Sequence, residues 1–382
     1  MEVKKLKECC TIIAGQSPES KYYNSNGDGL PFFQGKADFG ELYPSIRVYC
    51  SQPTKIAEKD DILLSVRAPV GPTNLAPCKV CIGRGLTAIR PSEVLLTRYV
   101  LLFFRYFEAQ LASKGTGTTF KAITQDVVKN LEIPIPPLPE QERIVARIEE
   151  LFSQLDAGVE TLKKTKAQLA VYRQAVLKEA FSYCAEKKPI REMSSIVTSG
   201  SRGWAKYYCD NGAKFIRIGN LTRNKIYIDL DDIQHVQLPD KAEGTRTKLA
   251  PNDVLVSITA DLGSIGLVPN GIGEAYVNQH IAMIRFNNQM QGEFYAWYLR
   301  SEYGQQDLLR NKRGGGKLGL GLDDIRDSRV PVVSNETAES ILSIIECRLS
   351  VCDSIEHTVG LALQQAEAMR QSILKDAFEG RL

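Results

Sequence analysis

The sequence predicts an α+β protein in which two pseudo-repeated domains of mixed α/β structure are separated by a long antiparallel two-helix coiled coil. Three observations lead to this fold class. The chain repeats itself once, each half ends in a long proline-free amphipathic segment, and the rest of each half is rich in short strand-like runs. A chain of 382 residues has room for two or three domains, and a hydrophobic fraction of 43% is enough to build their cores.

The internal repeat is clearest near the end of each half. Residues 173–181 read RQAVLKEAF and residues 370–378 read RQSILKDAF, with six of nine positions identical. The ungapped offset of 197 residues extends back to Pro134. Upstream the match continues with small shifts, as in DILLSV at 61–66 and DVLVSI at 253–258. A period this long indicates a duplicated domain rather than a solenoid.

Each half ends in a segment with helical periodicity. Glu140–Phe181 and its counterpart Glu336–Phe378 contain no proline. Each helix would be roughly 60 Å long at about 1.5 Å per residue, and its apolar stripe needs a partner in order to be stable in water. Both helices leave or re-enter globular parts, so we expect them to pair with each other in antiparallel fashion. The apolar positions are Ile144, Ile148, Leu151, Leu155, Val159, Leu162, Leu169, Tyr172 and Val176, then Ile341, Ile345, Leu349, Cys352, Ile355, Val359, Leu363, Met369 and Ile373.

The predicted domains are residues 1–132 and 184–329, and the helical segments are 133–183 and 330–382. Short β-branched or aromatic runs, separated by Gly, Pro, Asn and Asp, predict strands within both domains. One aromatic-rich helix in each domain is expected to pack on a sheet. The predicted strands include Ile62–Val66, Lys225–Ile228, Val254–Ile258 and Ile281–Phe286, and the predicted helices are Thr97–Leu111 and Gly292–Arg310.

A glycine-rich basic loop closes each globular part. The first reads KGTGTTFK at 114–121, and the second reads KRGGGK at 312–317. Glycine lets the backbone approach a ligand closely, and free N–H groups together with Lys or Arg bind phosphate oxygens. The loops recur at the same place in both halves, which favours a phosphate-contact role. The residues proposed for this contact are Lys114, Thr116, Thr118, Lys121, Lys312, Arg313 and Lys317.

Further candidates for nucleic-acid contact lie earlier in each globular part. The net charge is only +3, so DNA binding must depend on local basic patches. Arg, Asn and Gln pair bidentately with guanine or adenine edges, whereas Lys mainly contacts phosphates. For any one charged residue, an ordinary solvated surface charge is the competing interpretation. The candidates are Gln34, Lys36, Arg47, Arg67 and Arg84 in the first part, and Arg202, Trp204, Lys206, Arg217, Asn220, Arg223 and Lys225 in the second.

Several function classes lack their motifs in this sequence. There is no Asn-Pro-Pro-Tyr or Asp-Pro-Pro-Tyr tetrapeptide, no GxGxxG loop and no P-loop, so we expect neither catalysis nor a cofactor. Cys78 and Cys81 have zinc-like spacing without a second ligand pair, so no metal site is expected. The scattered cysteines, a charged Met1–Cys10 segment and the lack of long apolar runs predict a cytoplasmic protein without a membrane span.

Two signatures of the repeat resemble a known family. The stretch IPPLPEQERI at 135–144, followed by the long helix and RQAVLKEAF, resembles the central conserved region of type I restriction–modification specificity subunits. The ending QSILKDAFEGRL at 371–382 is similar to their distal conserved region. The resemblance implies two target-recognition domains that each read one half of a split, asymmetric site in double-stranded DNA. It also implies a helical spacer that fixes the gap, two docked methyltransferase subunits, two motor-nuclease subunits, and no catalysis by the chain itself.

Three other interpretations remain open at this point. A methyltransferase–reader fusion would need the cofactor and catalytic motifs that the sequence lacks. A DNA-free coiled-coil scaffold would show no salt-dependent DNA affinity. An orphan reader without enzymatic partners would be distinguished by its gene neighbourhood.

Overall fold

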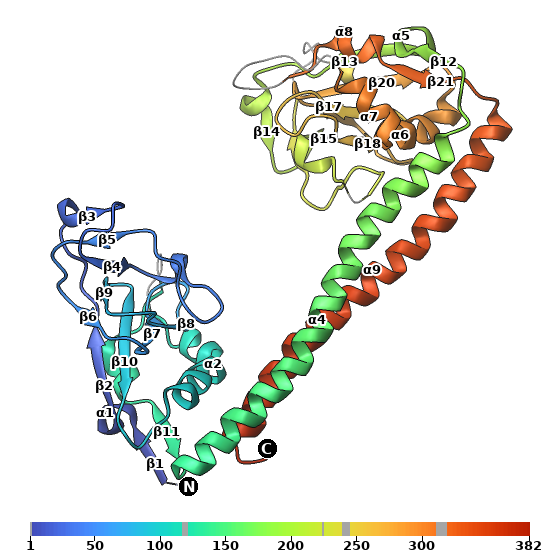
Figure 1. Cartoon of the computed structure of the whole chain (residues 1–382). Coiled ribbons are helices and arrows are strands. Elements are labelled where there is room, and N and C mark those ends of the chain that lie inside the picture. The colour runs from blue at the N-terminus through green and yellow to red at the C-terminus, as the bar shows by residue number, and fades with distance from the viewer. Residues whose placement is uncertain (1, 117–120, 224, 239–244, 311–318) are drawn as a thin grey trace. The chain divides into compact units, whose positions relative to one another are not determined.

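The computed structural model describes residues 2–116, 121–223, 225–238, 245–310 and 319–382. The chain divides into two compact units, each containing one globular domain and a segment of each of two long helices (Figure 1). Unit 1 comprises Met1–Lys163 and Gly360–Leu382, and unit 2 comprises Lys164–Val359.

Three sheets form within the described part of unit 1. The central one is antiparallel, with the order β2 (Cys10–Ala14), β10 (Leu86–Pro91), β7 (Ile62–Ser65) and β8 (Thr73–Leu75). The second has the order β3 (Tyr23–Asn24), β5 (Tyr49–Cys50), β4 (Leu30–Phe33), β9 (Val80–Ile82) and β6 (Ile56–Ala57), with β4 and β9 parallel. A small antiparallel pair joins β1 (Glu2–Lys5) to β11 (Glu132–Ile135).

The aromatic-rich segment of unit 1 forms α2 (Thr97–Ser113), as the sequence predicts, and contacts β8 and β10. Its buried face carries Tyr99, Phe103 and Phe104, which join the main apolar core of the domain. Burial of large aromatic side chains on the sheet supplies much of the driving force for this packing. Two shorter helices complete the unit, α1 (Leu6–Cys9) and α3 (Gln125–Lys129).

Unit 2 contains three sheets in its described residues. The central one has the order β13 (Ser194–Ser199), β20 (Ile281–Phe286), β17 (Val254–Ser257) and β18 (Ile265–Leu267). The second has the order β14 (Tyr208–Cys209), β16 (Gln234–Val236), β15 (Ala213–Ile216) and β19 (Ala275–Val277), with β15 and β19 parallel. The third pairs β12 (Lys187–Pro189) with β21 (Arg329–Pro331). The helices of the domain are α5 (Ile190–Met193), α6 (Gly292–Arg300), α7 (Glu302–Leu308) and α8 (Leu322–Asp327).

Two predictions for unit 2 need correction. The predicted helix 292–310 is interrupted at Ser301, whose extended backbone and side-chain hydroxyl begin α7 by accepting from the Gly304 amide. The segment 225–228 is not a strand. It makes a single bridge, from Tyr227 to Leu267, and the chain then turns away because the Asp229 amide donates to the Asn220 carbonyl at 2.8 Å.

The long helices are confirmed as α4 (Leu138–Phe181) and α9 (Asn335–Phe378), each of 44 residues. They make contacts with each other within each unit. In unit 1, Arg370 forms an ion pair with Asp156 and lies 4.9 Å above the Phe152 ring. In unit 2, Arg173 pairs with Asp353 at 2.5 Å and Glu356 at 3.0 Å.

Most of the predicted apolar stripe on the long helices is buried or half-buried, but Tyr172, Ile355 and Met369 are exposed. The prediction of a buried stripe is therefore wrong at these three positions. A strict repeat of 3.5 drifts relative to the 3.6 residues of each helical turn, so residues chosen by spacing alone can leave the contact seam. No described helix combines the length and apolarity needed to cross a membrane.

Candidate nucleic-acid interface

Unit 1 has a groove of about 710 Å³ that brings together four of the five candidates that precede the basic loop in its domain. Gln34, Lys36, Arg67 and Arg84 all line it and are all exposed. This lining has three cations and no carboxylate. The full lining, called groove 1 here, is Gln34, Gly35, Lys36, Ala37, Ser65, Arg67, Ala68, Pro69, Arg84 and Gly85.

Backbone hydrogen bonds between strand ends hold the walls of groove 1. The Gly83 amide donates to the Phe33 carbonyl at 2.8 Å, and the Val66 amide donates to the Gly85 carbonyl at 2.9 Å. A Cβ on Gly85 would lie only 2.3 Å from the Gln34 carbonyl oxygen, so glycine is required there for the two loops to approach. The walls of the groove are thus fixed by main-chain bonds, while the side chains of its four candidates are exposed.

Unit 2 has a groove of about 510 Å³ built from the corresponding strand ends. The Asn278 amide donates to the Ile216 carbonyl at 3.0 Å, and the Ile258 amide donates to the His280 carbonyl at 2.9 Å. The first bond joins the ends of β15 and β19, as the Gly83–Phe33 bond joins the ends of β4 and β9. The second joins the end of β17 to the start of β20, as the Val66–Gly85 bond joins the end of β7 to the start of β10. The full lining, called groove 2 here, is Arg217, Ile218, Gly219, Asn220, Asp229, Asp231, Asp232, Asn278 and His280.

The two grooves differ in charge. Groove 2 contains one candidate cation, Arg217, and three aspartates. Arg217 lies 3.9 Å from Asp232, whose side chain is fully exposed. His280 is fixed by the Thr259 hydroxyl, 2.7 Å from Nδ1, and by the Gln279 amide, 2.9 Å from Nε2. Carboxylates accept hydrogen bonds from exocyclic amino groups of bases, so the two grooves suit different base patterns.

The described part of the first glycine-rich basic loop adjoins groove 1, and the described residues that follow the second loop contact a strand end beside groove 2. In unit 1, Thr116 and Ala122 form a bridge, and the Ala68 amide donates to the Lys121 carbonyl at 2.9 Å. Lys114, Thr116 and Lys121 are exposed beside groove 1. In unit 2, the Leu320 amide donates to the Ile258 carbonyl at 3.0 Å, next to groove 2. Four loop candidates lie outside the described residues: Thr118, Lys312, Arg313 and Lys317.

Arg47, Asn220 and Trp204 are predicted candidates whose contacts hold parts of the protein together. Arg47 donates to the Ala37 carbonyl at 2.8 Å and lies 3.1 Å from Asp38, so it holds the short 3-10 helix η2 (Lys36–Asp38) in place beside groove 1. Asn220 is buried, and Trp204 is buried between aromatic rings. Burial of Asn220 and Trp204 argues for structural roles rather than base contact.

Asn220 illustrates how the second groove is built. It lies in the 3-10 helix η4 (Ile218–Asn220), where its oxygen accepts from the Arg217 amide at 2.8 Å. Its side-chain amide donates to the carbonyls of Asp229 and Asp232 at 2.9 and 3.0 Å. The aspartate-bearing loop of groove 2 therefore depends on this buried amide.

The remaining candidates in unit 2 lie outside groove 2. Arg202 and Lys206 are exposed, and Lys206 lies 4.9 Å from the centre of the Tyr207 ring. Arg223 pairs with Asp261 at 2.5 Å, and Arg223 lowers the pKa of that carboxyl, helped by the Ser264 hydroxyl. Lys225 lies 3.9 Å from Asp229.

Sequence reasoning missed the aspartates and the loop before β20. Asp229, Asp231, Asp232, Asn278 and His280 all line groove 2. A signal for the loop was available, because residues 278–280 immediately precede β20, just as residues 83–85 precede β10 in the other half of the repeat. The aspartates had no such signal, since hydrogen bonds from the Asn220 side chain bring their loop to the groove.

Comparison with known proteins identifies the family. The family described as "Type I restriction modification DNA specificity domain" matches residues 1–170 and 186–363, so the chain belongs to this family. It is 40% identical over 167 residues to the MjaX specificity subunit of Methanocaldococcus jannaschii, provisionally named as part of a type I restriction enzyme. That match covers 44% of this chain and 38% of the relative.

Two further relatives extend this picture. The chain is 24% identical over 327 residues to the type I restriction enzyme EcoBI specificity subunit of Escherichia coli, covering 76% of this chain and 67% of that one. It is 49% identical to a crystal structure of the HsdS subunit from Thermoanaerobacter tengcongensis, over 41% of this chain and 38% of that one, with a TM-score of 0.38. The chain thus spans less than two fifths of the length of the MjaX and HsdS proteins that it matches.

Proposed function

We propose that this chain is the DNA-sequence-recognition subunit of a type I restriction–modification complex and that it catalyses no reaction itself. The observation that carries this proposal is the pair of grooves built on corresponding strand ends of two domains. A reader of a bipartite site needs two such surfaces, and membership of the specificity family supports that role.

The different linings of the grooves support an asymmetric site. Gln34 can pair bidentately with adenine, and Arg67 or Arg84 with guanine. In groove 2, Arg217 can contact guanine, and the aspartates can accept from cytosine N4. The two half-sites should therefore differ in sequence.

The long helices serve as the spacer in this proposal. The ion pairs Arg370–Asp156 and Arg173–Asp353 lie at corresponding positions of the repeat and support an antiparallel two-helix coiled coil. We infer target-recognition domains at 1–132 and 184–329 and spacer helices at 133–183 and 330–382. A rigid spacer sets the distance between two half-sites along the DNA helix.

The partners follow from the family. We infer two methyltransferase subunits docked on the helical regions and two ATP-driven motor-nuclease subunits, with the complex acting on DNA in the cytoplasm. The relatives named as specificity subunits of restriction enzymes support this assignment of partners.

Co-expression with a methyltransferase subunit gene from the same genome in a methylation-free host, followed by genome-wide mapping of methylated adenines, tests the proposal. We expect one interrupted, asymmetric motif. The double variant Gln34→Ala, Arg84→Ala should relax or abolish recognition in one half only, because a bidentate base contact is worth about 1–3 kcal/mol of discrimination.

The matched control is Lys21→Ala, an exposed residue that pairs with Glu19 at 2.7 Å and does not line groove 1. The control should leave the motif unchanged. A stable complex with the methyltransferase that adds no methylation would contradict the two-groove reader. The absence of any complex would favour an orphan reader or a scaffold.

A further inference from the structure

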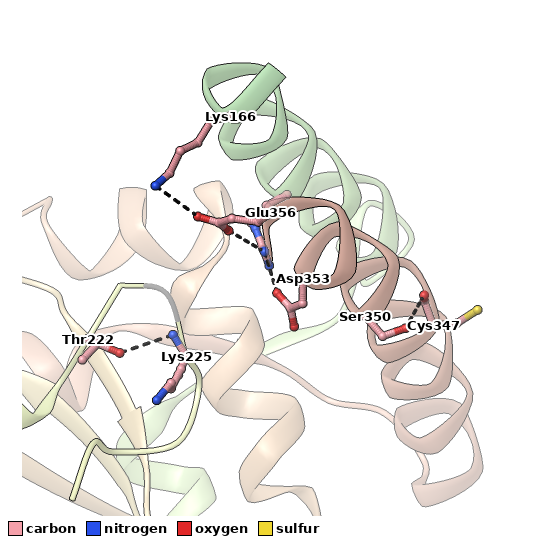
Figure 2. A network of polar contacts seen from close by, with 8 residues as sticks. Lys166, Thr222, Lys225, Cys347, Ser350, Asp353 and Glu356 are labelled. Carbon is pink, nitrogen blue, oxygen red and sulfur yellow. Dashed lines mark hydrogen bonds and ion pairs between the residues drawn. The ribbon is translucent and has the colours of Figure 1, made fainter. Parts of the chain in front are cut away.

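A basic pocket lies in unit 2 where the domain meets the long helices. It has a volume of about 360 Å³, and its lining includes Lys166, Arg173, Arg223 and Arg300, with Glu356 as its one carboxylate. These five residues define what is called the junction pocket here. Figure 2 shows Lys166 and Glu356 on the helices, and Thr222 and Lys225 on the loop that also carries Arg223.

Arg300 is the least compensated charge in the junction pocket. It donates to the Lys225 carbonyl at 2.7 Å, and its guanidinium lies 5.7 Å from the centre of the Trp297 ring. No carboxylate within the described ranges forms an ion pair with it. Burial, and then the charges of Arg173 and Arg223, lower the pKa of Arg300 to about 10. The guanidinium therefore stays charged at neutral pH, and an unpaired, partly desolvated charge is costly.

The other two arginines already have acidic partners. Arg173 pairs with Asp353 and Glu356, and Arg223 pairs with Asp261. An adjoining cavity of about 440 Å³ shares Arg223 and Arg300 with the junction pocket, and its Glu302 pairs with Lys178 at 2.9 Å. The surplus positive charge is thus centred on Arg300.

The equivalent place in unit 1 has the opposite charge balance. Arg105 on α2 donates to the Glu41 carbonyl at 2.7 Å, as Arg300 on α6 donates to the Lys225 carbonyl. Burial and then Arg98 lower the pKa of Arg105, but the carboxylates of Glu41 and Glu108 oppose this shift. The charged lining of the pocket there is Glu41, Asp156, Glu160, Glu367, Lys163 and Arg370. The basic junction pocket is therefore a feature of unit 2.

We propose that the junction pocket binds a phosphate group of the DNA backbone, with Arg300 as its central ligand. This inference rests on the proposed DNA-reading function. The guanidinium of arginine presents a planar fork of donors that matches phosphate oxygens, and arginine is the residue best suited to partly buried phosphate contacts.

The loops of unit 2 favour DNA as the source of that phosphate. The loop that carries Arg223 starts at η4, whose residues line groove 2. Arg223 forms an ion pair with Asp261 on the loop that follows β17. The same loop carries Thr259, whose hydroxyl contacts the groove 2 residue His280. Groove 2 and the junction pocket are therefore linked through both loops, and in this proposal a duplex seated in groove 2 brings a backbone phosphate to Arg300.

The dependence of DNA affinity on salt tests the inference, using the full chain and the variant Arg300→Gln. Each phosphate neutralised by the protein contributes about 0.9 to the slope of log K against log salt concentration. We expect the variant to reduce the slope by about 1 and to weaken cognate and non-cognate duplexes alike, by about tenfold, since phosphate contacts carry no sequence information.

Four further measurements keep this result interpretable. Arg105→Gln, which removes the corresponding arginine of unit 1, should keep the wild-type slope. Arg300→Lys should retain most of the slope that Arg300→Gln loses. Thermal unfolding reports whether Arg300→Gln remains folded. Titration with inorganic phosphate, monitored by Trp297 fluorescence, distinguishes a DNA phosphate from free phosphate as the ligand. A saturable fluorescence response, together with a salt slope for DNA that Arg300→Gln leaves unchanged, would assign the pocket to free phosphate and overturn the backbone contact.

An unchanged slope without a phosphate response would overturn the inference altogether. This failure is distinguishable from a failure of the proposed function. In the latter case the wild-type chain itself would show no preference for the mapped motif over non-cognate DNA.

Discussion

At the scale of single residues, one buried ion pair anchors each domain. Asp253 accepts from Arg285 at 2.8 and 2.6 Å, and Asp61 accepts from Arg90 at 2.8 Å through both oxygens. Each aspartate also accepts from a backbone amide three residues earlier. The aspartate thus fixes both the turn that enters a central strand and the strand beside it.

Removal of the aspartate should destabilise each domain, but to different extents. Asp253→Ala leaves Arg285, whose side chain is only 21% exposed, without its carboxylate, whereas Arg90 is 41% exposed and can be hydrated after Asp61→Ala. We expect Asp253→Ala to lower the free energy of unfolding by roughly 3–5 kcal/mol, and Asp61→Ala by less. Urea unfolding measures both, with Asp210→Ala as an exposed control. Equal losses at the two sites would contradict the argument from exposure.

A second residue-scale prediction concerns pH. Arg223, with help from Ser264, lowers the pKa of Asp261 below its ordinary value of 3.8. A carboxyl whose folded-state pKa is depressed stabilises the fold above its unfolded pKa and loses that contribution as the pH falls through the folded value. Arg223→Gln should return the pKa of Asp261 towards 3.8. NMR titration of this carboxyl checks the shift, and an unchanged titration midpoint in the variant would show that Arg223 is not its cause.

Residue type alone could not separate contact residues from structural ones. Asn220 and Trp204 have suitable chemistry for DNA binding, but the fold buries both. Conversely, the sequence separates Gln34, Lys36, Arg67 and Arg84 by up to 50 positions, and the fold brings them into one groove. Burial and loop proximity depend on long-range backbone bonds, which a local sequence pattern does not encode.

At the scale of elements, local periodicity was sufficient to predict the two long helices and several strands of the central sheets. The apolar repeat predicted α4 and α9 to within two residues, and β-branched runs predicted β7, β17 and β20 closely. The prediction of a strand at 225–228 fails although the run is strand-like, because the turn held by Asn220 takes the chain away from the sheet. Local preference determines an element only where tertiary contacts agree with it.

The start of α4 depends on one buried amide. Gln141 is fully buried, and its side chain accepts from the Leu96 amide and donates to the carbonyls of Val94 and Pro136, all at 2.9 Å. Gln141→Ala should lower the free energy of unfolding by roughly 1–3 kcal/mol for each group left unsatisfied. Hydrogen exchange at the Leu96 amide should increase, whereas the exposed neighbour change Glu142→Ala should leave it unaltered. Continued protection of that amide in Gln141→Ala would show that the glutamine does not tie the helix to the domain.

At the scale of the whole molecule, the proposed function assigns base recognition to the grooves and the spacing of the two half-sites to the long helices. The grooves contain the side chains that suit base contact, and the helices contain the repeated ion pairs that suit a spacer. Changes in a groove should then alter one half-site, and changes in the helices should alter only the gap.

Lengthening both helices together tests this separation. Seven residues inserted after Lys163 and seven after Val359, where the two units divide on each helix, retain a heptad register and add about 10.5 Å at 1.5 Å per residue. With about 34 Å for each 10-base-pair turn, the gap in the methylated motif should grow by about three base pairs while both half-sites stay the same. Methylation should weaken, because three base pairs also rotate one half-site by roughly 100° around the DNA axis. Insertion in one helix alone should abolish methylation by shifting the helices out of register, whereas an unchanged gap in the double insertion would show that the helices do not set the spacing.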